Sequence, residues 1–258
     1  MVRGLYTAYT GMANEQKRLD IIANNVANAS TVGYKKESVT NQAFDEVLTL
    51  KIRDGSEGFL NKKIGTMSLG VKLGEVYTDY GQGSLRQTGN SYDLAIEGKG
   101  FFQVRGSDAN GTDVIRYTRD GNFTTTSDGY VVDSEGNFLQ GEGGDIQVPV
   151  DAASVAIGRD GGIYADSIKI DTVALTDFED YDYLKKVGDT SYELLDGGTT
   201  KDATGALMQG YTEQSNVNAV SEMVSMITIT RAYEANQKVI STVDGMLDKS
   251  VNSVGRVG

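Results

Sequence analysis

Apolar residues at the N-terminal end of the chain recur at alternating steps of three and four. The positions on this line include Leu5, Tyr9, Met12, Leu19 and Val26. Charged side chains lie beside the line, and Gln16 is its one clearly polar member. A narrow seam of this kind, sustained for about four heptads, is typical of a helix that packs along another helix. We therefore predict an N-terminal helix that ends near Asn28.

The C-terminal segment has the same periodicity. Its seam runs through Met226, Ile229, Tyr233, Ile240, Val243 and Leu247, with the polar Asn236 among them. A polar residue inside a seam trades stability for a fixed register. A second apolar stripe begins earlier, at Val217, Val220, Val224 and Ile227. Ser215 or Asn216 is the expected N-cap, because a short polar side chain can accept a bond from a free backbone N–H.

Two narrow seams at opposite ends of one chain suggest a single helical domain. The simplest arrangement pairs the helices with each other, as a coiled coil that is discontinuous in sequence. The alternative is that two unrelated amphipathic helices pack on a β core. The periodicity leaves both arrangements open.

The middle of the chain has the pattern of an all-β domain. Short apolar or β-branched runs alternate with turns such as Asp120-Gly121 and Asp160-Gly161. Asp-Gly pairs suit tight hairpins, because both residues tolerate positive φ angles. The runs expected to be strands are 93–96, 101–104, 114–118, 123–126, 130–132, 146–148, 155–157 and 168–170. Their spacing of about eight to twelve residues predicts mostly antiparallel strands.

The predicted fold class is therefore α+β, with a discontinuous coiled-coil helical domain from the two chain ends and a mostly antiparallel all-β central domain. Residues 41–48 fit either a short helix or a strand, and residues 51–69 indicate an extended excursion. The expected divisions are an N-terminal helix in 1–34, an extended linker or inner β region in 35–92, an outer β domain in 93–199, a return linker in 200–211 and a C-terminal helix in 212–258.

Composition excludes several chemistries. The 258 residues include no cysteine, histidine or tryptophan and a single proline. This rules out disulfides, thiolate nucleophiles, Ser-His-Asp triads and metal sites built from histidine or cysteine. The net charge of −12 argues against nucleic acid as a partner, since nucleic-acid binding needs a basic face. The hydropathy pattern predicts neither a membrane-inserted helix nor a cleaved secretory signal.

The remaining residue patterns do not indicate catalysis or ligand binding. The glycine-rich segments 98–100 and 141–144 complete no phosphate-binding motif. The acidic run 177–182 lacks the spacing of a calcium-binding loop, and we expect a solvated loop there. A carboxylate pair of the glycosidase type stays open, because such a pair forms only in three dimensions. We assign no catalytic residue, no cofactor and no metal ligand.

Three groups of segments, in order along the chain, resemble the signatures of the bacterial flagellar rod and hook axial proteins. The first, 23–35, contains Asn24, Asn25, Asn28, Gly33 and Tyr34. Segments 92–104 and 117–123 are similar to the central β motif of that family. The last, within 210–247, contains Arg231, Glu234 and Asn236. The chain looks most like the distal rod branch, with a proximal rod or hook-type paralogue as the alternative.

The resemblance implies a structural subunit of the flagellar basal-body rod. Members of the family are exported unfolded by the flagellar type III apparatus, without a cleaved signal. They then polymerise helically, with other rod and hook proteins as neighbours, into the drive shaft that crosses the periplasm. Their terminal helices line the tube, and their β domain packs outside. A cell-wall glycan hydrolase is the competing hypothesis from a different class.

Two finer expectations accompany the resemblance. Phe44 and Leu48 match the short Phe-x-x-x-apolar pattern by which early subunits dock at the export gate, although packing under the β domain would explain both residues equally well. Copies that pack through their helices must also tolerate the net charge of −12. We therefore expect the acidic residues mostly on the outer β domain.

Overall fold

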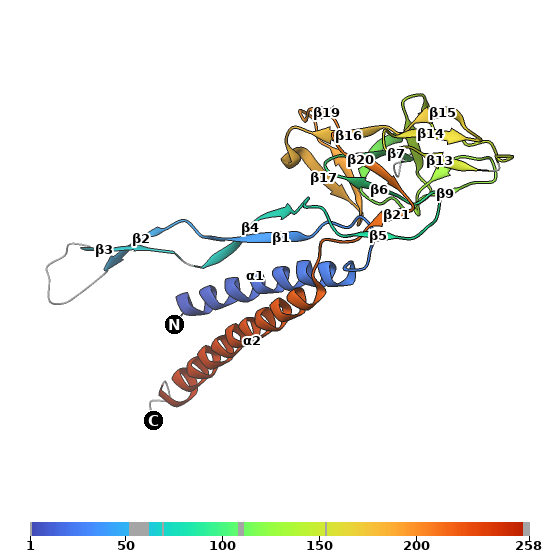
Figure 1. Cartoon of the computed structure of the whole chain (residues 1–258). Coiled ribbons are helices and arrows are strands. Elements are labelled where there is room, and N and C mark those ends of the chain that lie inside the picture. Colours follow the sequence, from blue (N-terminus) through green and yellow to red (C-terminus); the bar gives the residue numbers. More distant parts are fainter. Residues whose placement is uncertain (1, 52–61, 69, 108–110, 153, 255–258) are drawn as a thin grey trace. The chain divides into compact units, whose positions relative to one another are not determined.

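The computed structural model describes residues 2–51, 62–68, 70–107, 111–152 and 154–254. These residues form two α-helices with a mostly β region between them, which confirms the α+β class (Figure 1). Every strand pairing among them is antiparallel. Neither of the two helices in this part of the chain combines the length and the hydropathy that crossing a membrane requires.

The chain divides into two compact units. Unit 1 comprises Met1–Ala27, Glu37–Asp79 and Asn218–Gly258. Unit 2 comprises Asn28–Lys36 and Tyr80–Val217. Both terminal segments therefore belong to the same unit, although most of the chain separates them in sequence. The finer division into five segments stays a prediction.

Unit 1 is built on the two helices α1 (Val2–Ala27) and α2 (Ala219–Lys249), the second of which continues as a π-helical turn over Ser250–Val254. A Cβ atom on Gly11 would lie 3.0 Å from Nδ2 of Asn236. Near the other end of α1, Asn25 donates to Glu222 across 3.4 Å. The helices therefore lie side by side and run antiparallel (Figure 1). The predicted end of the first helix, near Asn28, is confirmed.

The start of α2 differs from the prediction. Its N-cap is Asn218, which accepts a bond from the backbone N–H of Ser221 at 3.1 Å. Ser215 and Asn216 were the wrong candidates, because each of their side-chain oxygens already accepts another bond. Asn216 accepts a hydrogen bond from the N–H of Lys36 at 2.8 Å, and Ser215 accepts one from the N–H of Val217 at 3.2 Å.

Unit 1 also contains two β ribbons. Strand β1 (Glu37–Ala43) pairs with β4 (Val71–Thr78), and β2 (Val47–Lys51) pairs with β3 (Lys62–Met67). Most of segment 41–48 is therefore strand, which decides between the two predicted alternatives. The predicted excursion over 51–69 lies partly outside the described residues, because 52–61 and 69 are not among them.

The β region of unit 2 forms several small sheets. One extended sheet contains β7 (Phe101–Ser107), β8 (Asp113–Thr118), β9 (Thr124–Thr125), β10 (Val131–Val132), β11 (Phe138–Gly141), β12 (Gly144–Asp145), β16 (Leu175–Phe178), β17 (Leu184–Val187), β18 (Ser191–Leu194) and β19 (Thr200–Asp202). A second contains β13 (Val155–Ile157), β14 (Gly162–Ala165) and β15 (Ile168–Thr172). Two further pairs join β6 (Leu94–Glu97) to β20 (Ala206–Gln209), and β5 (Leu85–Gln87) to β21 (Tyr211–Glu213).

Most of the predicted central strands occur in the structure. The exception is 146–148, where the ladder is reduced to one isolated bridge between Tyr130 and Gln147. The two strand pairs that include β20 and β21 return the chain from the β region to α2. Through β5 and β6, these pairs hold the returning chain against the first strands of the β region.

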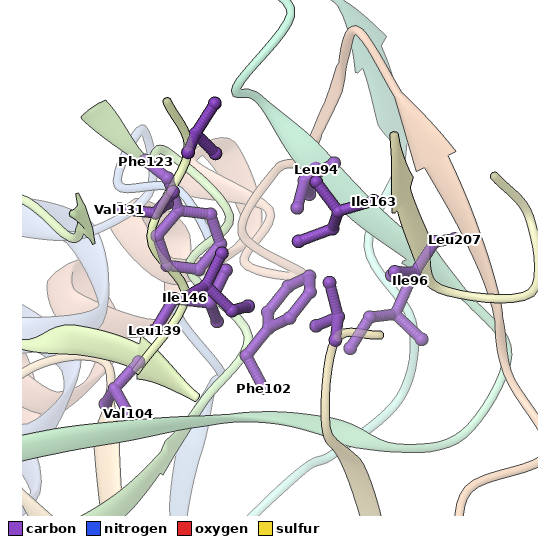
Figure 2. Close-up of a cluster of buried hydrophobic side chains, with 12 residues drawn as sticks. Leu94, Ile96, Phe102, Val104, Phe123, Val131, Leu139, Ile146, Ile163 and Leu207 are labelled. Atoms are coloured by element: carbon purple, nitrogen blue, oxygen red, sulfur yellow. The ribbon is translucent and has the colours of Figure 1, made fainter. Parts of the chain in front are cut away.

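The core of unit 2 draws on adjacent residues of one strand. Phe102 belongs to the larger cluster shown in Figure 2, where its ring meets that of Phe123 edge to face at 5.2 Å. Phe101 belongs to a second cluster with Phe178 and Tyr192. Successive residues of a strand point to opposite faces, so β7 supplies both clusters. This strand therefore holds the β region together.

The acidic run 177–182 is not simply a solvated loop, as predicted. Asp177 is only 1% exposed, on β16. Its carboxylate accepts a bond from the hydroxyl of Tyr181 at 2.7 Å and pairs with Lys201 at 3.2 Å. Lys201 lies directly opposite Asp177 on the neighbouring strand β19. The long-range strand pairing, which sequence alone does not reveal, supplies the counterion that offsets this burial.

Candidate assembly site formed by the terminal segments

The predicted seam residues are buried or partly buried in the structure, with one exception. On α2, Ile229 is 3% exposed, and the other members of the seam are partly buried: Met226, Tyr233, Ile240, Val243 and Leu247. On α1, the partly buried members are Leu5, Met12, Leu19 and Val26. Tyr9 is the exception, since it is 57% exposed on the outer side of α1.

Asn25 is the polar residue on which the three segments of unit 1 meet. Its side chain is fully buried, and its amide is paired with the backbone of Glu37 at the start of β1. Nδ2 donates to the carbonyl of Glu37 at 2.7 Å, and the N–H of Glu37 donates to Oδ1 at 3.0 Å. Nδ2 also lies 3.4 Å from the buried carboxylate of Glu222 on α2. One amide thus connects α1, β1 and α2.

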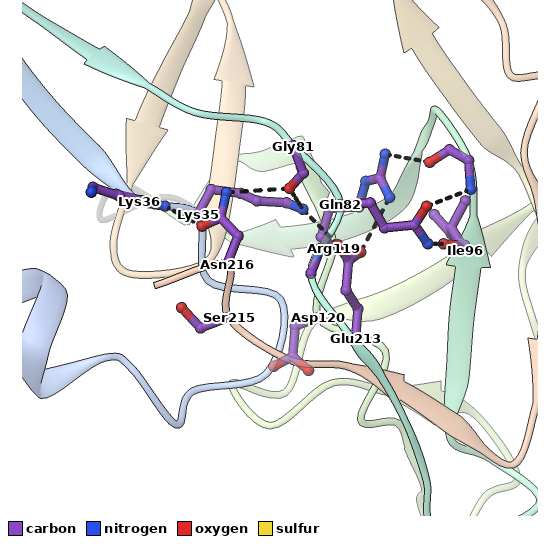
Figure 3. A network of polar contacts seen from close by, with 12 residues as sticks. Lys35, Lys36, Gly81, Gln82, Ile96, Arg119, Asp120, Glu213, Ser215 and Asn216 are labelled. Atoms are coloured by element: carbon purple, nitrogen blue, oxygen red, sulfur yellow. Dashed lines mark hydrogen bonds and ion pairs between the residues drawn. The ribbon is translucent and has the colours of Figure 1, made fainter. Parts of the chain in front are cut away.

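In unit 2, a charged cluster connects three segments that are distant in sequence. Lys35 and Arg119 both bind the carboxylate of Glu213, with N···O distances of 2.6 and 3.2 Å (Figure 3). The side chains of Lys35 and Glu213 are 1% exposed and that of Arg119 is 4% exposed. We call these three residues the buried triad. Each comes from a different one of the three sequence signatures.

Backbone groups complete the coordination of the buried triad. The carboxylate of Glu213 accepts the N–H of Gly83 at 2.8 Å. Lys35 donates to the carbonyl of Gly81 and Arg119 to that of Gly98, both at 2.9 Å. A buried ion pair needs such additional bonds, because its own attraction barely offsets the loss of hydration. The triad is therefore specific to this arrangement of the chain.

Gly33 and Tyr34 pack beside the buried triad. Gly33 has a φ of +70°, and its N–H donates to the backbone carbonyl of Glu213 at 2.8 Å. A Cβ atom at Gly33 would lie 2.3 Å from the backbone nitrogen of Asp120, so no side chain fits there. The ring of Tyr34 is fully buried, and the ammonium of Lys186 lies 4.1 Å from its centroid. Both residues fix the path of segment 28–36.

The remaining signature residues have different environments. Asn28 accepts a bond from the hydroxyl of Thr31 at 2.9 Å. Asn236 is partly buried against Gly11, whereas Asn24, Arg231 and Glu234 are exposed. Sequence reasoning thus singled out Asn25, Gly33 and Tyr34 but not the members of the buried triad. The sequence does show that each of the three signatures contains one member of the triad. It does not show that these charged side chains are buried.

Asp120 has an unusual electrostatic environment. It is 8% exposed, and burial raises the pKa of its carboxyl to about 6. The carboxylates of Asp133, Glu135 and Asp93 raise the pKa further, against the N–H of Asn122, which lowers it. Within the described ranges, no group of three or more acidic residues is arranged to hold a metal ion. The backbone of Asp120 packs on Gly33, and its carboxylate accepts a bond from the N–H of Asn122 at 3.0 Å.

Comparison with known proteins identifies the family. Three family models match, described as "Flagella basal body rod protein" over residues 5–35, "Flagellar hook protein FlgE/F/G D1 domain" over 95–165 and "Flagellar basal body rod FlgEFG protein C-terminal" over 208–253. The chain is 36% identical to the flagellar basal-body rod protein FlgG of Bacillus subtilis, over 98% of this chain and 99% of the relative. The chain belongs to the flagellar basal-body rod protein family. It is therefore a structural subunit of the rod and not an enzyme.

Relatives within this rod family include two paralogues. The chain is 35% identical to FlgG of Caulobacter vibrioides, over 95% of this chain and 97% of that protein. It is 33% identical to FlgF of the same organism, over the full length of both. The three matched models contain Asn25, Lys35, Arg119 and Glu213, so the buried triad lies in the parts of the chain that define the family. The glycan hydrolase hypothesis is set aside, because the family is structural.

We predict that removing the charge of Glu213 destabilises unit 2 strongly. Glu213→Gln keeps the shape of the side chain but removes the buried negative charge that Lys35 and Arg119 share, which costs about 3–5 kcal/mol of unfolding free energy. The control is Glu97→Gln, which breaks the exposed pair between Arg159 and Glu97 and costs less than about 1 kcal/mol. Urea unfolding of the purified chain measures both. Equal effects of the two substitutions would contradict a special role of the triad.

A second prediction concerns Gly33. Gly33→Ala adds a steric conflict with Asp120 to the cost of a positive φ angle. Gly136→Ala is the matched control: Gly136 has a φ of +86°, and a Cβ atom there would have open space around it within the described part of the chain. The control loses about 1–2 kcal/mol of unfolding free energy, and Gly33→Ala loses clearly more. Denaturant titrations that gave the same loss for both would show that the close approach is unimportant.

The third prediction concerns pH. A carboxyl whose pKa is higher in the folded chain than in the unfolded chain stabilises the fold at low pH. Asp120 loses that contribution as the pH rises from about 4 through about 6. Relative to Asp120→Asn, the wild type should lose about 1–3 kcal/mol of unfolding free energy between pH 4 and pH 8. Identical pH slopes in the two proteins would contradict the assigned environment.

Proposed function

We propose that the chain is a distal-type rod subunit that polymerises helically through its two terminal helices, paired as a coiled coil that is discontinuous in sequence. The FlgG relatives from Bacillus subtilis and Caulobacter vibrioides support the distal assignment. The similarity to FlgF keeps the proximal paralogue as the alternative. The antiparallel contact between α1 and α2 supports the pairing of the helices.

The distribution of charge carries the proposal. Unit 1 contains 12 basic and 13 acidic residues, a net charge of −1. Unit 2 contains 12 basic and 23 acidic residues, a net charge of −11. Like charges on closely packed copies repel, and the repulsion grows with the net charge of the surfaces that meet. A nearly neutral helical unit is thus suited to packing between copies, and the acidic unit 2 to a position outside the contacts.

The seam residues have a defined part in this proposal. Leu5, Met12, Leu19 and Val26 of α1, with the seam of α2, hold the helix pair together within one subunit. Asn236 sets the register of the pair, because its polar side chain lies against Gly11, where no Cβ intervenes. Exposed positions on the outer sides of the helices are then left for contacts between copies.

Export and location complete the proposal. The subunit would be delivered by the flagellar type III export apparatus without a cleaved signal, and it would work in the periplasm with other rod and hook proteins as partners. Phe44 is 38% exposed on the described surface of unit 1, which leaves its ring accessible for docking at the export gate. The side chain of Leu48, the other half of the predicted signal, lies outside the described part of the structure.

Substitution in the seam tests the proposal. Ile240→Asp places a carboxylate on the partly buried side of α2, which costs several kcal/mol unless the helices separate. We expect cells that carry this variant as their only copy to lose rods and motility, while the unfolding transition of unit 2 is retained. Ile240→Leu, which conserves volume, is the control and should swim normally.

The readout is swarm diameter together with electron microscopy of isolated basal bodies. Normal rods with Ile240→Asp would show that assembly does not depend on the partly buried side of the C-terminal helix. A tagged copy located in the same basal bodies separates the two paralogues, since a distal subunit lies on the hook side of the rod and a proximal one on the cell side.

A further inference from the structure

The last part of unit 2 along the chain lies against its first strands. We call residues 205–217, which contain β20 and β21, the closing segment. β20 pairs with β6, and β21 pairs with β5. In addition, the N–H of Gly210 donates to the carbonyl of Asp93 at 2.8 Å. The N–H of Gln214 donates to the carbonyl of Ser84 at 2.9 Å. The first strands of unit 2 therefore pair with the strands that come last in it.

The closing segment also completes the larger core cluster of unit 2. Leu94 and Ile96 of β6 and Leu207 of β20 are each 1% exposed and belong to this cluster (Figure 2). Leu207 lies directly opposite Ile96 in the ladder between the two strands. Among the described strands, β6 and β20 form a two-stranded sheet of their own. Without the closing segment, β6 would therefore expose apolar side chains and an unpaired strand edge.

The buried triad makes the closing segment necessary for a second reason, which is charge. Lys35 and Arg119 come before the closing segment in the sequence, and Glu213 lies within it. A chain that is synthesised from its N-terminus thus presents both cations before their shared carboxylate. Burying an ammonium or a guanidinium group without a counterion is strongly unfavourable. Before Glu213 is available, these two residues favour conformations in which they stay hydrated.

We propose that the closing segment is a latch for folding: the central strands of unit 2 become stable only when this segment docks. The pairing of β6, the core contact of Leu207 and the neutralisation by Glu213 all come from this one segment, so all three are gained in the same step. Folding of unit 2 is thereby delayed until most of the chain has been made. The delay arises from contacts within unit 2, so it is independent of assembly into rods.

Refolding of the full-length chain from urea tests the latch. Pulse labelling with deuterium, read by mass spectrometry, measures when β7 and the closing segment become protected from exchange. We expect both to gain protection in the same kinetic phase. Glu213→Gln should slow the protection of β7 about a hundredfold, because the transition state for folding then lacks the shared carboxylate. The substituted residue lies on β21, so an effect on β7 reports the coupling between the two segments.

Leu207→Ala is a second variant, which decides the question where Glu213→Gln prevents folding altogether. Its matched control is Leu139→Ala. Leu139 is also 1% exposed in the larger core cluster, but it lies on β11 of the extended sheet. We expect Leu207→Ala to slow the protection of β7 at least as much as Leu139→Ala does.

Protection of β7 before the closing segment in the wild-type chain would overturn the proposal. An unchanged rate of β7 protection in Glu213→Gln would overturn it as well. Where that variant does not fold, a smaller effect of Leu207→Ala than of Leu139→Ala has the same meaning. In each of these cases the central strands fold first, and the closing segment docks onto them afterwards.

Discussion

The shared carboxylate of Glu213 is the interaction on which the arrangement of unit 2 depends. It neutralises Lys35, from the segment that follows α1, and Arg119, from the central β region. All three side chains are almost completely buried, so none of the charges can be hydrated if another is missing. The chain can therefore reach this fold only when the segment after α1, the central strands and the return strand β21 have met. Asn25 has a similar function in unit 1, with an amide in place of charges.

These two polar centres give a structural role to several residues of the sequence segments that resemble the rod family. Asn25 and Gly33, in and just after the last turn of α1, make contacts with segments outside the helix. Asn25 pairs with the backbone of β1, and Gly33 makes room for the backbone of Asp120. Their side chains, or the lack of one, determine the path that the chain takes within each unit. Such contacts make the fold specific, because each is made only in one arrangement of the chain.

The division of charge connects this architecture with assembly. Nearly all of the net negative charge resides in unit 2, and the helices of unit 1 are close to neutral. The exposed apolar residues on the outer sides of α1 and α2 have no apolar partner within the described part of the subunit. Exposed apolar surfaces of this kind generally mark contact with another molecule. The same helix pair thus combines buried residues such as Ile229 with exposed apolar residues such as Val220 and Val224.

The sequence by itself determined the two helices, most of the central strands and the family, because periodicity, turn residues and signatures are local properties of the chain. It also pointed to Asn25, Gly33 and Tyr34. Only the tertiary structure decided that Lys35, Arg119 and Glu213 meet, that Asp177 is buried against Lys201, and that Asn218 rather than Ser215 or Asn216 caps α2. The reason is the same in each case. Whether a polar side chain is buried depends on partners that are distant in sequence, or on bonds already made elsewhere, and neither has a local signal.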